Sequence, residues 1–230
     1  MDCNTSIRHA IQASSHHSTK ADPVPVFTIA SSKGGPGKTT VAMLLTGRLA
    51  AEGLKLSALD ADPTKALSRW AANTYEGPAF AVHAEADETR LAHLIDAESR
   101  SADLVLVDTA GFGNRAATVA MTSADAVLVP CLSGEADLHE AESTVRLVDG
   151  LARAARRDIP ARVLLNRIKR TQLARHAARE AAGLPLLTST LSDLVAFGEV
   201  SFSGQAPTQG SAGEELSRLL AELRLLGWIP

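Results

Sequence analysis

From residue 24 onward, short apolar runs alternate with longer segments of helical periodicity. Successive side chains in the short runs are mostly apolar, a pattern typical of strands buried on both faces of a parallel sheet. These runs are VFTIAS, KLSALDAD, FAVHA, LVLVDTA, AVLVPC and ARVLLNR. The segments predicted as helices are 39–51, 65–74, 88–100, 114–123 and 136–157. This order predicts a doubly wound α/β fold with a mostly parallel sheet and helices on both faces.

The two ends of the 230-residue chain differ from this pattern. Residues 1–23 are polar and without periodicity, so we predict a disordered leader followed by one domain at 24–230. A last helix is predicted at 214–226, and its leucine stripe should pack on the sheet; the stripe is Leu216, Leu219, Leu220, Leu223 and Leu226. The N-terminus has no signal-peptide pattern and no run approaches the length of a membrane span. Cys3 and Cys131 lie far apart, so we expect a cytoplasmic protein without a disulfide framework.

A phosphate-binding loop lies between the first apolar run and the first predicted helix. The stretch SSKGGPGKTT ends as the pattern GxxxxGK[ST] requires, but has Ser32 where that pattern has its first glycine. Backbone N–H groups of the glycines and of the helix N-terminus can surround phosphate oxygens, which predicts a P-loop NTPase that binds ATP and Mg²⁺. Lys38 would reach the β- and γ-phosphates, the Thr39 hydroxyl would ligate Mg²⁺, and Thr40 would lie near the α-phosphate. The expected nucleotide contacts of the loop are Gly34, Gly35, Pro36, Gly37, Lys38, Thr39 and Thr40.

Two acidic clusters follow predicted strands and support a bound Mg²⁺. Asp108 ends the run LVLVD, and a carboxylate at the C-terminal end of a buried strand can hold a water on the metal. Asp60 and Asp62 end another run, and positions two apart on a strand point the same way, so both could face the metal and the attacking water. The alternative for Asp62 is that it caps the helix that follows.

The segments KGGPGKTT, LDADP, VLVDTAG and LLNRIKRTQLAR, in this order, resemble the ParA/MinD family of deviant Walker ATPases. The resemblance implies that Lys33 reaches the phosphates of the partner subunit in an ATP-bound homodimer. It also implies that Asp62 positions or deprotonates the hydrolytic water, that Asp60 belongs to the Mg²⁺ network and that Asn166 contacts adenine. The stretch LDADPTKALSRWAAN is most similar to the short ParA-type and VirC-like members.

Basic residues are concentrated between Arg146 and Arg179, where 10 arginines and lysines accompany 2 aspartates in a chain of net charge −3. On the predicted helix 136–157, the apolar positions form one stripe and leave arginines on another face. Only 3% of the residues are aromatic, so we expect contacts to phosphates rather than stacking on bases. We predict non-specific binding to double-stranded DNA, although a solvated charged face is the alternative. The predicted DNA-binding residues are Arg153, Arg156, Arg157, Arg175 and Arg179.

These features predict an ATP hydrolase whose ATP-bound dimer binds DNA and drives DNA partition, with Lys33, Lys38 and Asp62 as catalytic residues. An adaptor protein is expected to stimulate hydrolysis, and the ATP-bound protein is expected on the nucleoid. One alternative is a VirC-like accessory ATPase for conjugative DNA transfer. Another is a small-molecule ligase of the dethiobiotin synthetase type, which the KGG and DADP elements fit less well. The last predicted helix mixes acidic with basic residues, so no membrane binding is expected.

Overall fold

The computed structural model describes residues 24–111, 113–169 and 183–230, so the predicted leader 1–23 lies outside the described residues. Within these ranges six strands form one sheet, in the order β3-β2-β4-β1-β5-β6, and every pairing is parallel. The strands are β1 (Val26–Ile29), β2 (Leu56–Ala61), β3 (Ala81–Ala84), β4 (Leu104–Thr109), β5 (Ala126–Cys131) and β6 (Ala161–Leu165). The predicted doubly wound fold is confirmed.

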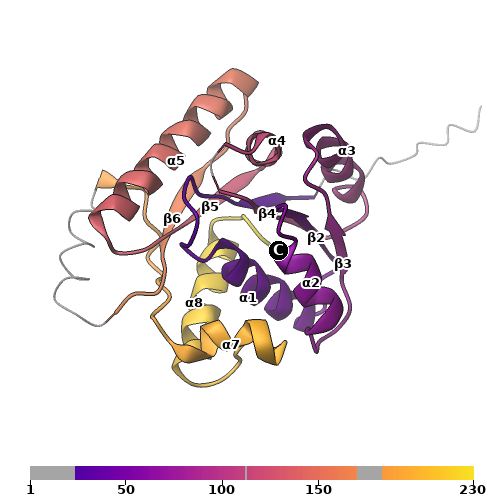
Figure 1. Ribbon diagram of the computed structural model, residues 1–230, viewed down its shortest axis with the longest axis vertical. Helices are drawn as coiled ribbons and strands as arrows, with labels where there is room; N and C mark the ends of the chain where they lie inside the picture. Colours follow the sequence, from indigo (N-terminus) through magenta and orange to yellow (C-terminus); the bar gives the residue numbers. More distant parts are fainter. Residues whose placement is uncertain (1–23, 112, 170–182) are drawn as a thin grey trace, which may run out of the picture.

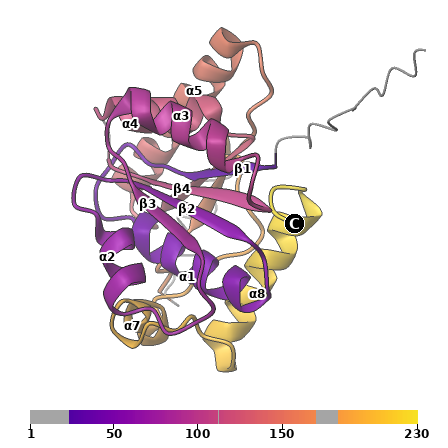
Figure 2. The same ribbon diagram turned by 90° about the vertical axis from the view of Figure 1, so that its right-hand side faces the viewer.

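Helices cover both faces of this sheet (Figure 1). Figure 2 shows the sheet nearly edge-on between the two helical layers. One layer contains α1 (Lys38–Ala51), α2 (Ala66–Asn73), α7 (Val195–Ser203) and α8 (Gly210–Leu225). The other contains α3 (Glu88–Glu98), α4 (Arg115–Ser123) and α5 (Glu135–Ala155). Because side chains on both faces of β1, β2, β4 and β5 are buried under these layers, those strands need apolar residues at successive positions.

At the margins of the fold, one sequence expectation is wrong and one helix was not predicted. The residues of β3 are exposed or half-buried, because β3 is the edge strand and has a neighbouring strand only on the β2 side. The helix α7 has no counterpart among the predicted helices. It buries Phe197 and Val200, but it also has two exposed apolar residues, Val195 and Phe202, on its outer side. That arrangement produces no continuous apolar stripe in the sequence.

The last helix packs as its leucine stripe predicts, with the exception of Leu226, which is 37% exposed because α8 ends one residue earlier. Two of its carboxylates bind the chain that follows β6: Glu215 accepts hydrogen bonds from the backbone N–H and hydroxyl of Ser192, and Glu222 accepts from two backbone N–H groups. Neither α8 nor any other helix of the described residues is long and apolar enough to cross a membrane. The leucines buried by α8 are Leu216, Leu219, Leu220 and Leu223.

The strand register brings two predicted site residues together. β4 lies between β1 and β2, and Asp108 on β4 is the register partner of both Ile29 on β1 and Asp60 on β2. In a parallel sheet, register partners on neighbouring strands point to the same face. Asp60 and Asp108 are therefore neighbours at the end of the sheet where the phosphate-binding loop leaves β1.

Candidate nucleotide-binding site

The loop between β1 and α1 turns through two glycines in the left-handed region, Gly35 with φ 98° and Gly37 with φ 92°. Residues with a Cβ rarely adopt this conformation. At Gly37 a Cβ would also lie only 2.6 Å from Nδ2 of Asn166. α1 begins directly after Gly37, which has no side chain to cap it. The N–H groups of the first turn therefore have no capping side chain as acceptor, and an anion in the loop can accept hydrogen bonds from them.

Lys38 is the first residue of α1, and its side chain turns back into the loop. The residue is 7% exposed, and Nζ donates hydrogen bonds to Oγ of Ser31 at 3.1 Å and to the carbonyl of Lys33 at 3.1 Å. Burial lowers the pKa of Lys38, and the charges of Asp108 and Asp62 act in the opposite direction. The ammonium group is thus held at the centre of the loop with carboxylates around it, as the phosphate-binding role requires.

Asp108 is fully buried on β4, and neither of its carboxylate oxygens has a hydrogen-bond partner among the described residues. Burial raises the pKa of Asp108 to about 7. The neighbouring Thr39 hydroxyl and the charge of Lys38 lower this pKa, while the charges of Asp60 and Asp62 raise it. A buried carboxylate without a partner is costly, and a hydrated cation next to Thr39 would satisfy it.

Asp60 and Asp62 both lie in this region, but they are held differently. Asp60 is 1% exposed, and its carboxylate accepts from the backbone N–H of Ser68 at 2.8 Å and of Asp62 at 3.2 Å. Burial raises the pKa of Asp60, and the hydrogen bond from Ser68 lowers it. β2 ends one residue before Asp62, so the expectation that strand alternation orients both carboxylates is wrong. Asp62 Oδ1 instead accepts from the backbone N–H of Thr64 in the turn before α2.

The start of the loop rests on α5, through contacts that sequence patterns hardly indicate. The Ser32 hydroxyl donates to the Glu140 side chain at 2.7 Å and accepts from the Thr144 hydroxyl at 3.0 Å. The backbone N–H of Ser32 donates to the same Thr144 oxygen. Lys33 forms an ion pair with Asp137, with 3.0 Å between Nζ and Oδ1. These side-chain contacts explain why serine replaces the usual glycine at position 32. In the sequence, that replacement is the feature that could have indicated a contact between the loop and another element.

Asn166 follows β6 and closes the other side of the loop. Its side-chain Nδ2 donates to the carbonyl of Pro36 at 2.8 Å. A groove of about 580 Å³ opens beside this contact and runs from the loop to α7. A base attached to phosphates in the loop could lie there, so the adenine contact inferred for Asn166 stays a prediction. The groove is lined by Gly35, Gly37, Thr40, Asn166, Phe197 and Phe202, among others.

The residues present fit a magnesium nucleotide better than a free metal ion. Among the described residues, no three histidine, cysteine or acidic side chains are grouped so as to hold a metal by themselves. Mg²⁺ is usually bound by one or two protein oxygens together with substrate phosphates and water. The Thr39 hydroxyl and the unpartnered Asp108 carboxylate provide that kind of donor set beside Lys38.

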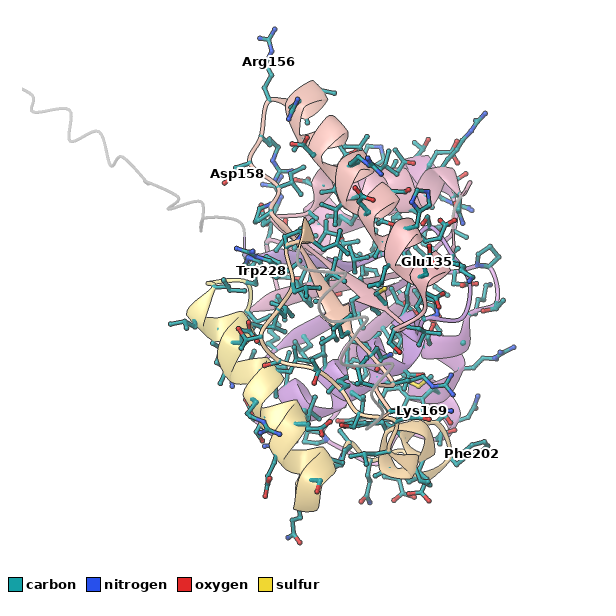
Figure 3. All side chains as sticks on the ribbon, turned by 90° about the vertical axis from the view of Figure 1, so that its left-hand side faces the viewer. Glu135, Arg156, Asp158, Lys169, Phe202 and Trp228 are labelled. Atoms are coloured by element: carbon teal, nitrogen blue, oxygen red, sulfur yellow. The ribbon has the colours of Figure 1, made fainter. Side chains whose placement is uncertain are left out.

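The predicted DNA-binding arginines are only partly together. Arg153 pairs with Asp149 at 2.8 Å, and Arg157 lies beyond the end of α5 and pairs with Asp125 at 2.7 Å. No ion pair is recorded for Arg156 within the described ranges, and Figure 3 shows this side chain pointing away from the molecule at the free end of α5. The two other predicted residues lie outside the described residues, namely Arg175 and Arg179.

Sequence relatives match most of this chain. Residues 24–207 match the family model described as VirC1 protein. Protein virC1 from Rhizobium rhizogenes is 32% identical over 187 residues, which cover 78% of this chain and 81% of the relative. Protein ParA from Rhizobium radiobacter is 36% identical over 108 residues, which cover 46% of this chain and 48% of the relative.

Solved structures show the same fold at lower sequence identity. The ATP complex of McdA from Cyanothece superposes with a TM-score of 0.74 at 16% identity, covering 91% of this chain and 98% of the other. The Mg-ADP complex of the septum site-determining protein MinD from Pyrococcus horikoshii gives 0.71 at 21% identity, covering 89% and 97%. The family match and the relatives agree with the loop and its carboxylates, and the fold is that of the McdA and MinD structures. The chain belongs to the VirC1 family.

Proposed function

We propose that this protein is a Mg²⁺-dependent ATPase whose ATP-bound form is a homodimer that binds double-stranded DNA without sequence preference and acts in DNA partition. The observation that carries the ATPase part is the buried, unpartnered carboxylate of Asp108 beside Lys38 and Thr39. A group of this kind is unfavourable in an apolar interior and gains its partner when a nucleotide-bound cation is present. The kinship with ParA and VirC1 proteins supports the partition part.

Each side chain of the site has a role in this proposal. Mg²⁺ bound with ATP would neutralise part of the negative charge of the phosphates. Lys38 holds the β- and γ-phosphates, while the Thr39 hydroxyl and Asp108 hold the hydrated cation. Asp60, fixed by two backbone N–H groups, keeps a negative charge next to that network. Asp62 positions the attacking water and accepts its proton, after which ADP and phosphate leave.

Dimerisation is assigned to Lys33. Its side chain is 50% exposed, in contrast to that of the buried Lys38, and it lies on the outer side of the loop. An ammonium group in that position can reach phosphates bound to a second subunit. ATP would then be a ligand of both subunits, so the dimer would form only with nucleotide.

DNA binding is assigned to the free end of α5. Arg153 and Arg156 are exposed there, and dimerisation doubles the number of such arginines. Since affinity for DNA depends steeply on how many phosphates are neutralised together, the dimer should bind much more tightly than the monomer. An adaptor protein that accelerates hydrolysis would then release the DNA.

The nucleotide part is tested by comparing two lysine variants. Lys38→Ala should lose binding of a slowly hydrolysed ATP analogue, because the group at the centre of the loop is removed. Lys33→Ala should still bind the analogue but remain monomeric in light scattering. Asp62→Ala should dimerise with ATP and release little phosphate. A Lys33→Ala variant that dimerises like the parent would contradict the cross-subunit role.

The DNA part is tested by anisotropy titrations of two unrelated duplexes at several salt concentrations, with and without the ATP analogue. We expect similar affinity for both duplexes, an increase with analogue, and a steady loss of binding as salt rises. Equal binding with and without analogue would contradict the proposed switch. A strong preference for one duplex would contradict the non-specific mode and favour the alternative role in conjugative DNA transfer.

A further inference from the structure

The first half of α5 holds the lysine that the proposed dimer needs. Lys33 Nζ lies 3.0 Å from Asp137 Oδ1, and Ser32, one residue earlier, is bound by Glu140 and Thr144 one and two turns further along the same helix. The side chain of Asp137 is only 19% exposed. If residue 134 had a Cβ, that atom would lie only 2.8 Å from Asp137 Oδ2. Glycine at position 134 therefore leaves room for the carboxylate.

The contact with Asp137 and a contact with a second subunit exclude each other in space. A lysine side chain bound to a carboxylate on its own α5 cannot extend across an interface at the same time. When ATP-bound subunits meet, phosphate oxygens of the partner must replace Asp137 as the acceptor for the Lys33 ammonium group. The ion pair therefore stabilises the monomer relative to the dimer.

We propose that Asp137 is a positioning residue that retains Lys33 in its own subunit and thereby lowers the affinity of ATP-dependent dimerisation. The inference rests on the dimer of the proposed function and deepens it, because it identifies the group that opposes dimerisation. Glu140 and Thr144 fix the backbone at Ser32, so Lys33 leaves Asp137 by side-chain rotation on an anchored loop.

The size of the effect follows from the exposure of the pair. Ion pairs that water reaches change an equilibrium by roughly 1.4- to 5-fold. Two such pairs break when two subunits associate, so removing both should lower the dimer dissociation constant roughly 2- to 30-fold.

The test compares Asp137→Asn with Glu135→Gln, which removes a negative charge from the same first turn of α5 and has no contact with Lys33. Light scattering over a protein dilution series with the ATP analogue should show tighter dimers for Asp137→Asn and no change for Glu135→Gln. Gly134→Ala, which displaces the carboxylate and keeps its charge, should shift dimerisation in the same direction as Asp137→Asn. Equal dissociation constants for the parent and Asp137→Asn would overturn the proposal, as would equal shifts in Asp137→Asn and Glu135→Gln.

A second measurement separates failure of this inference from failure of the proposed function. Without nucleotide, the rate at which an amine-reactive ester labels Lys33, read by peptide mass spectrometry, should rise severalfold in Asp137→Asn and stay unchanged in Glu135→Gln. An exposed lysine, Lys65, gives the internal reference. If the parent protein never dimerises with analogue, the proposed function fails while the labelling result still decides whether Asp137 retains Lys33. An unchanged labelling rate overturns the retention itself.

Discussion

Replacing Asp108 by asparagine should make the nucleotide-free protein more stable and at the same time inactivate it. The pKa of Asp108 is raised by burial from the ordinary value of 3.8 to about 7, so between these pH values the folded protein holds a proton that the unfolded chain has released. The free energy of unfolding therefore falls as pH rises through this window. At about 1.4 kcal/mol per pKa unit, this raised pKa lowers the free energy of unfolding by about 4 kcal/mol at pH 8, where Asp108 is ionised in the folded protein, and by about 2 kcal/mol at pH 5, where it is still protonated.

Asp108→Asn removes this titration and keeps the shape of the side chain. The variant should gain stability relative to the parent, and its gain at pH 8 should exceed its gain at pH 5 by roughly 2 to 3 kcal/mol. Urea unfolding of both proteins at the two pH values, without nucleotide or magnesium, measures the difference. Asp158→Asn, which removes an exposed carboxylate, is the matched control for the loss of one negative charge.

Binding should reverse the order of the two proteins. With Mg²⁺ and the ATP analogue, the parent should be stabilised strongly and Asp108→Asn only weakly, because the carboxylate that satisfies the cation is gone. A variant whose stability gain is the same at both pH values would refute the assignment of a buried, titrating carboxylate. A variant with undiminished Mg²⁺-dependent hydrolysis would refute the metal role of Asp108.

Three further variants test the packing of α7 and α8 and the arginine end of α5. Gly204→Ala should lose at least about 2 kcal/mol in urea unfolding, because φ there is 66° and the added Cβ would lie 1.9 Å from the carbonyl of Thr74. Arg156→Gly should gain about 0.5 kcal/mol in the free energy of unfolding, because Arg156 has φ 54° at the C-cap of α5. In the same variant, the log–log salt slope of DNA binding should fall by about one for each DNA phosphate that the dimer no longer neutralises. Glu215→Ala should lose about 1–3 kcal/mol because it removes both acceptors of Ser192, and Glu214→Ala on the exposed side of α8 is the control.

The sheet and the centre of the site could be predicted because each depends on local sequence. Strands buried on both faces require apolar runs, and a phosphate-binding loop requires glycines and a lysine at fixed spacing directly after a strand. Lys38 and Asp108 follow from these rules alone, since a strand end and a helix start place them at the same edge of the sheet. Asp62 shows where such reasoning fails: β2 ends one residue too early for strand alternation to apply.

Long-range contacts carry no comparable signal. The partners of Ser32 and Lys33 on α5 lie more than 100 residues away in sequence, and no spacing rule relates them. The basic segment 146–179 is a different case. Its composition gives the number of charged residues but does not show which of them form ion pairs. Arg153 and Arg157 are paired with aspartates, one of which, Asp125, belongs to a different part of the chain. Arg156 is the member of that group for which the structure records no such neighbour among the described residues.

α5 touches the nucleotide loop at one end and carries the exposed arginines at the other, which limits how ATP can control DNA binding. The helix has 21 residues, which corresponds to about 30 Å between the turn of Asp137 and Arg156. Charges at that distance are screened in physiological salt, where the Debye length is about 8 Å. Breaking the ion pair of Lys33 therefore cannot change the potential at Arg156 directly. The buried side chains Leu138 and Val148 also fix the helix to the sheet. Control must then come from bringing two copies of the arginine end together, so DNA affinity should follow the concentration of dimer rather than the occupancy of the nucleotide site.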